Sequence, residues 1–118
     1  MISLTGLVLF CEDIESCRDI YEKIGFCFTV KKRGAAPSYY ISRTTSGFIL
    51  ELRPARIPNA REQIRFMADD LGAIMFALQQ ICEIEIISGN IDSPEMITFR
   101  DPDGRRIILS QSKGDFYV

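Results

Sequence analysis

The side chains able to carry out chemistry in this chain are carboxylates, amides, arginines, hydroxyls and thiols, because its 118 residues include no histidine. Histidine is the usual general base near neutral pH and the usual protein ligand of transition metals. Its absence excludes serine–histidine and cysteine–histidine nucleophile pairs. Any acid–base catalysis by a histidine-free chain would have to use another group, such as a carboxylate.

The thiols do not form a recognisable metal or disulfide pattern. Cys11, Cys17, Cys27 and Cys82 lie in apolar stretches and lack the paired CxxC spacing of zinc sites. We therefore expect buried, unreactive core cysteines rather than a disulfide framework.

Composition sets limits on the partners. The chain is 47% hydrophobic and 25% charged, as in one soluble globular domain, and its net charge is -2. No basic cluster is present to bind nucleic acid, and no apolar run is long enough to cross a membrane. Because MISLTGLVLF lacks the features of a secretory signal, we predict a cytoplasmic protein with neither a nucleic-acid nor a membrane partner.

The elements that would position these side chains occur twice in the sequence, as a repeated unit. A shift of 57 positions aligns LVLFCEDI with IRFMADDL and places Asp13 on Asp70. Each aspartate is suited to cap a helix. The apolar stripes that follow have the same three- and four-residue steps, and Gly25 is suited to end the first helix. The stripes are Ile14, Cys17, Tyr21 and Ile24, then Leu71, Ile74, Leu78 and Ile81.

Three strands are predicted after each helix. They span about 26–33, 38–44 and 47–54, then 82–88, 95–100 and 105–111. The strand at 82–88 is the least regular, because EIEIIS alternates out of step with FCFTV. The order predicts an α+β fold of two tandem βαβββ modules, about 1–56 and 57–118, within one domain.

The motifs IYEKIGF and FRDPDGRRIIL, within a doubled βαβββ pattern, make the chain resemble the vicinal oxygen chelate superfamily. This group includes glyoxalase I, extradiol dioxygenases, fosfomycin-resistance enzymes and bleomycin-resistance proteins. The resemblance implies a curved mixed sheet around a concave cavity, with the helices on the outer face.

The resemblance also marks positions where the family's enzymes hold a divalent metal, usually with histidine, glutamine and glutamate. Here these positions carry Gly6, Glu51, Gln63 and Ile108. One carboxylate and one neutral amide are too few donors to displace the hydration of a divalent ion. We therefore predict no metal and no cofactor. Structural explanations stay open for two of these residues: Gly6 marks a bulge or a close backbone approach, and Glu51 pairs with a neighbouring arginine.

Strand alternation predicts which side chains face the cavity. Arg53 and Arg65 either bind an anionic group of a ligand or neutralise Glu51 and its neighbours. Tyr39 and Phe99, on the middle strands, are further candidates as stacking surfaces. The complete predicted ligand-binding set is Val8, Phe10, Tyr39, Ile49, Glu51, Arg53, Gln63, Arg65, Met67, Phe99, Ile108 and Ser110.

These residues favour a metal-independent protein that binds a small organic ligand, drug or metabolite. The resemblance is to the bleomycin-resistance branch, where two chains form the cavity, and so implies a homodimer and a role in antibiotic resistance. One alternative is a lyase, isomerase or dioxygenase-like enzyme with a non-standard metal site, or with Glu51 as general base. Another is an accessory protein whose cavity is vestigial.

Overall fold

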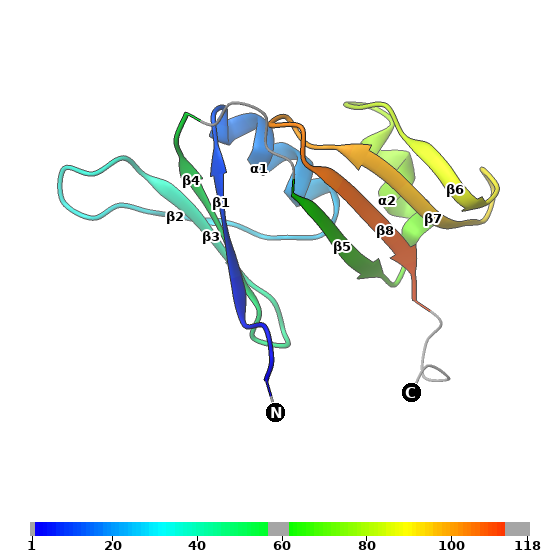
Figure 1. The fold of residues 1–118 in the computed structure, drawn as a ribbon, viewed down its shortest axis with the longest axis horizontal. Helices are drawn as coiled ribbons and strands as arrows, with labels where there is room; N and C mark the ends of the chain where they lie inside the picture. The colour runs from blue at the N-terminus through cyan, green and yellow to red at the C-terminus, as the bar shows by residue number, and fades with distance from the viewer. Residues whose placement is uncertain (1, 57–61, 113–118) are drawn as a thin grey trace. The chain divides into compact units, whose positions relative to one another are not determined.

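The computed structural model describes residues 2–56 and 62–112 and divides the chain into two compact units, Met1–Pro58 and Asn59–Val118 (Figure 1). Each unit contains one strand, one helix and three further strands. The α+β class and the tandem βαβββ order are therefore confirmed. The first unit contains β1 (Gly6–Cys11), α1 (Ile14–Lys23), β2 (Thr29–Lys31), β3 (Tyr39–Arg43) and β4 (Ile49–Pro54). The second contains β5 (Gln63–Ala68), α2 (Leu71–Leu78), β6 (Glu85–Gly89), β7 (Pro94–Arg100) and β8 (Arg106–Gln111).

Each unit forms its own mixed sheet of four strands, in the order β1-β4-β3-β2 and β5-β8-β7-β6. The first and last strands of a unit are parallel neighbours, and the other pairs are antiparallel. The two registers are equivalent, since Gly6 pairs with Ile49 as Gln63 pairs with Arg106. The internal repeat of the sequence is thus a repeat of strand pairing.

One face of each sheet is buried beneath the helix of its own unit. Helix α1 packs on β4, and α2 packs on β7 and β8. Leu50 and Leu52 on β4 are fully buried, as are Ile107 and Leu109 on β8. Each buried aliphatic side chain contributes about 1.5–3 kcal/mol to folding. These positions alternate along β4 and β8 with Glu51, Arg53, Ile108 and Ser110, which the sequence predicts to face the cavity.

The helices begin at the predicted aspartates. The Asp13 carboxylate accepts the Ser16 N–H at 3.2 Å, and the Asp70 carboxylate accepts the Ala73 N–H at 3.1 Å. Gly25 follows α1 with φ +121°, a conformation that favours glycine. Helix α2 is shorter than its apolar stripe predicts: it ends at Leu78, which leaves Ile81 in a turn and 46% exposed.

Strand β6 is irregular because its pairing with β7 shifts register between Ile86 and Ser88 and again before Gly89. This irregularity is the structural counterpart of the broken alternation in EIEIIS. The expectation of four buried cysteines is wrong for two of them: Cys11 and Cys17 are buried, but Cys27 is exposed and Cys82 is partly exposed. Neither helix of the described ranges is long and apolar enough to cross a membrane.

Candidate functional site

The face of the first sheet opposite α1 carries most of the residues predicted there. Val8 on β1 lies beside Glu51 on β4, and Glu51 lies beside Ile41 on β3. In the next row Phe10 pairs with Arg53. Val8 and Phe10 are each 46% exposed, whereas Leu9 between them is buried. This open face of the first unit is therefore apolar at β1 and charged at β4.

Glu51 is held by an arginine of its own strand. The Arg53 guanidinium donates to the Glu51 carboxylate from Nε at 2.9 Å and from Nη2 at 2.8 Å. The same guanidinium lies 4.2 Å above the centre of the Tyr39 ring, an arrangement that favours a cation–π interaction. Of the two roles open for Arg53, the structure shows neutralisation of Glu51.

Gly6 is a point of close backbone approach. A Cβ atom at this position would lie 2.8 Å from the carbonyl oxygen of Ile49 on β4. Backbone atoms of a central strand cannot easily move aside, so any side chain here would displace β1. The structural explanation for glycine at this family ligand position therefore holds.

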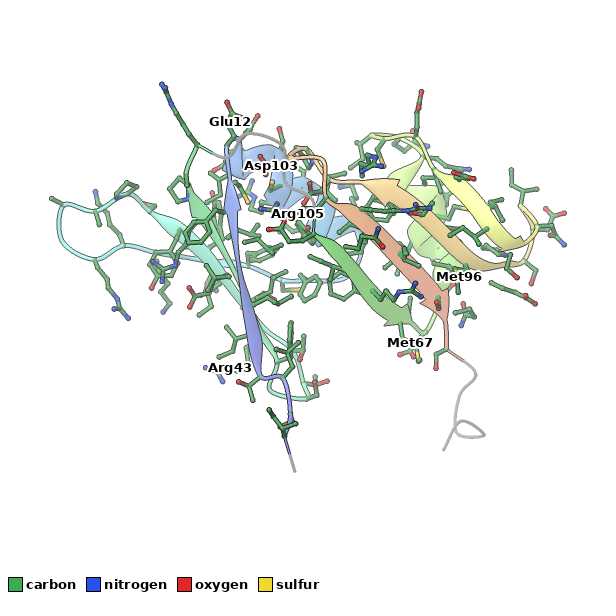
Figure 2. The ribbon with its side chains drawn as sticks, viewed as in Figure 1. Glu12, Arg43, Met67, Met96, Asp103 and Arg105 are labelled. Atoms are coloured by element: carbon green, nitrogen blue, oxygen red, sulfur yellow. The ribbon has the colours of Figure 1, made fainter. Side chains whose placement is uncertain are left out.

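The open face of the second sheet is built in three rows across its strands. Gln63 on β5 pairs with Arg106 on β8, and Arg106 pairs with Arg100 on β7. The remaining rows are Arg65, Ile108 and Thr98, then Met67, Ser110 and Met96. Figure 2 labels Met67 and Met96, which flank Ser110 from β5 and β7. Alternation thus brings Gln63, Arg65, Met67, Ile108 and Ser110 onto one face.

The residues at the family metal positions do not fit a divalent ion. Gly6 offers no donor, and Glu51 is bound by Arg53. Ile108 is only 6% exposed and fills its position with hydrocarbon. Gln63 alone adds a neutral amide, and a divalent ion needs several converging oxygen, nitrogen or sulfur donors. The donor set at these positions is therefore inadequate.

A pocket lies on the second sheet. Its volume is about 540 Å³, within the range of small-molecule sites. Residues from the α2–β6 connection, β6, β7 and β8 surround it. Its lining residues are Cys82, Glu83, Ile84, Glu85, Thr98, Arg100 and Arg106.

Hydrogen bonds hold the polar wall of this pocket. Thr98 is buried; its hydroxyl donates to the Ile107 carbonyl at 2.9 Å and accepts from Arg106 Nε at 3.1 Å. Arg100 Nη1 donates to the Gly104 carbonyl at 2.9 Å. Burial raises the pKa of the Cys82 thiol above its usual value of 9.0, so this thiol is protonated at neutral pH.

The structure corrects one member of the predicted site. Phe99 pairs with Ile107, on the helix-covered face, and is 4% exposed. Because neighbours on a strand point to opposite faces, Thr98 and Arg100 face the pocket and Phe99 cannot. Tyr39, by contrast, lies on the open face of the first sheet beneath Arg53.

Sequence reasoning missed the whole pocket wall, since none of its lining residues belongs to the predicted ligand-binding set. Glu83, Glu85, Thr98 and Arg100 were not among the predicted ligand-binding residues, yet they line the pocket. The period of two in β7 was the available signal, since it places Thr98 and Arg100 on one face. Glu83 and Glu85 alternate with Ile84 and Ile86, so the same kind of signal was present for the glutamates.

Solved structures with the same fold cover almost all of the chain. The bleomycin-binding protein complexed with bleomycin is 19% identical, with a TM-score of 0.63 over 96% of this chain and 100% of that one. TnmS3, an antibiotic-binding protein from a Streptomyces species, is 20% identical, with a TM-score of 0.69 over 96% and 98%. A possible glyoxalase from Bacillus cereus is 19% identical, with a TM-score of 0.70 over 93% and 99%. No sequence-family profile and no curated protein sequence matches the chain.

Proposed function

This chain has the vicinal oxygen chelate fold, and on that premise we propose that it is a metal-independent protein that binds a small organic molecule. Two proteins of the same fold are described as binding bleomycin and an antibiotic. By analogy, the proposed role is to sequester a drug or metabolite, with antibiotic resistance as one form of it.

The observation that carries this proposal is the state of the family metal positions. Glu51 is neutralised by Arg53 at 2.8 Å, and Ile108 replaces the second acidic ligand. The pocket of about 540 Å³ on the second sheet supplies a space of ligand size. Adjacent apolar and charged side chains are the composition of a binding site for an organic molecule.

The enzyme alternative with Glu51 as general base is weaker, because the Arg53 guanidinium already binds the Glu51 carboxylate from two nitrogen atoms. An accessory role would require a partner surface in place of the ligand.

We also propose a homodimer, since β1 and β5 are edge strands whose open faces carry exposed Phe10 and Met67. A cytoplasmic location stays a prediction of the sequence.

Two measurements on the intact protein test the proposal. Metal analysis after purification without chelator should find less than stoichiometric divalent metal, and Mn²⁺, Zn²⁺ or Ni²⁺ should not raise the melting temperature. A thermal-shift panel of antibiotics and metabolites should yield stabilising compounds, because ligand at a hundred times its Kd adds about 2.7 kcal/mol. Stoichiometric metal lost in Glu51→Gln would overturn metal independence, and no hit across a broad panel would favour the accessory role.

A further inference from the structure

The pocket of the second unit combines Arg100 and Arg106 with Glu83 and Glu85. In the described ranges, no arginine of this group forms a salt bridge with a glutamate of the group. Arginine and glutamate side chains that share a small pocket without pairing with one another can each pair with an oppositely charged group of a ligand. The pocket therefore favours a ligand that has both a negative and a positive group.

The arginines form the cationic end. Arg100 and Arg106 are directly paired across β7 and β8, and like charges in that position repel. Each is held by one hydrogen bond, Arg106 Nε to Thr98 and Arg100 Nη1 to Gly104, as described above. These bonds leave Nη1 and Nη2 of Arg106 and Nη2 of Arg100 as donors. A carboxylate between the two guanidiniums would accept from both and offset their repulsion.

The glutamates form the anionic end. Glu85 pairs with Thr98 on β7, two residues from Arg100 along that strand. Two residues of a strand span about 7 Å, so the two ends of the pocket are separated by a distance of that order. Ile84, which lies between Glu83 and Glu85 in the sequence, also lines the pocket. An ammonium group at the glutamates would complement their charge.

We propose that this pocket binds a small zwitterion: a carboxylate at Arg100 and Arg106, an amine at Glu83 and Glu85, and a short apolar body between them. This inference deepens the proposed function and rests on it, because it names the class of molecule taken by the second unit. It requires no metal and no covalent step.

Three rigid probes test the contribution of each ligand charge to binding separately. The zwitterion 4-(aminomethyl)benzoate carries both groups at opposite ends of a ring, 4-methylbenzoate keeps only the carboxylate, and 4-methylbenzylamine keeps only the amine. NMR titration of the full chain should give the zwitterion about tenfold higher affinity than either analogue, since each lost charge-assisted hydrogen bond is worth roughly a factor of ten or more. Amide shifts should be concentrated in β6, β7 and β8.

Two variants test which pocket residues bind the amine and which bind the carboxylate. Glu85→Gln should lower the affinity for 4-(aminomethyl)benzoate to about that of 4-methylbenzoate, while leaving the latter unchanged. Arg100→Gln should weaken both carboxylate probes about tenfold and leave 4-methylbenzylamine unaffected. Both residues are exposed, so melting temperatures should stay near the wild-type value. Arg33→Gln, at an exposed residue between β2 and β3, is the matched control and should change none of the affinities.

The inference is overturned if the three probes bind equally, if Glu85→Gln preserves the preference for the zwitterion, or if no probe shifts any resonance at about 10 mM. These results differ from failure of the proposed function. Hits from the thermal-shift panel that keep their affinity in Arg100→Gln and Glu85→Gln would leave a small-molecule binding protein with a different ligand class.

Discussion

Ile108 and Glu51 occupy equivalent places in the two units, as the matching strand registers show: Arg65 pairs with Ile108 as Val8 pairs with Glu51. Ile108 is 6% exposed and stabilises the sheet by its burial. A carboxylate in that place would need a compensating partner. At the scale of the residue, the second unit has an apolar side chain where the resemblance leads one to expect a metal ligand.

Tyr40 joins α1 to the first sheet through its hydroxyl. The hydroxyl donates to the Glu15 carboxylate and accepts from Arg18 Nη1 at 3.3 Å, while the Arg18 guanidinium lies 5.0 Å from the ring centre. Tyr40→Phe should therefore lower the free energy of unfolding by about 1 kcal/mol, measured by urea denaturation. Tyr39→Phe, on the opposite face of β3, is the control and should change stability by less than about 0.5 kcal/mol.

The same contact predicts a pH dependence. The hydrogen bond to Glu15, followed by burial, raises the pKa of Tyr40 above its usual value of 10.0. A raised folded pKa means that the stabilisation is fully present below pH 10 and is lost as pH rises through the folded value. The stability difference between wild type and Tyr40→Phe should therefore shrink above pH 10. A difference that stays constant up to unfolding would contradict the assignment.

The close packing of β1 on β4 at Gly6 leads to a prediction about stability. In Gly6→Ala the new Cβ atom would lie 2.8 Å from the Ile49 carbonyl oxygen, so β1 or β4 must shift. We expect a loss of about 1–3 kcal/mol in the free energy of unfolding. Gly72→Ala in α2 is the control, since its Cβ would be 3.7 Å from the nearest atom; it should gain up to about 1 kcal/mol. A neutral Gly6→Ala would show that the strands are not closely apposed.

At the scale of the element, helix α1 depends on the carboxylate at its N-cap. The side-chain hydrogen bond from Ser16, followed by that from the Ser16 N–H, lowers the pKa of Asp13 below 3.8. A depressed folded pKa stabilises the protein above the unfolded value, and this stabilisation is lost as pH falls through the folded value. Asp13→Ala should therefore lower the melting temperature at pH 7, and the gap should narrow below pH 3.8. Asp13→Asn keeps a cap but does not titrate, so its melting temperature should vary less over this range.

Strand β6 contributes to the pocket through its regularly paired first residue and is irregular only further along. Its register shifts against β7 interrupt the alternation that, in other strands, predicts the face to which each side chain points. Glu85 is nevertheless paired with Thr98, so it contributes to the same pocket as Arg100 and Arg106. The regular start of β6 therefore places an acidic side chain in one pocket with two basic side chains.

At the scale of the whole molecule, the proposed homodimer is the property to measure first. The first sheet has β1 and β2 as edge strands and the second has β5 and β6, and an edge strand can pair with another chain. Sedimentation velocity should therefore give a particle of twice the 13.4 kDa chain mass. Met67→Lys, at a residue 58% exposed on β5, tests whether the open face of that strand takes part. A monomer at about 100 µM would contradict the homodimer proposal.

The sequence by itself determined the repeat, the two capped helices, the order of the strands along the chain and the faces of β1, β4, β5 and β8, because these follow from short-range periodicity and local capping. It also identified which residues stand where the resemblance places metal ligands, because that depends only on residue identity at aligned positions. Only the tertiary structure decided that Arg53 neutralises Glu51 and that Glu85 lines one pocket with Arg100 and Arg106. Those outcomes depend on rotamers and on pairing between distant strands, and neither has a local signal in the chain.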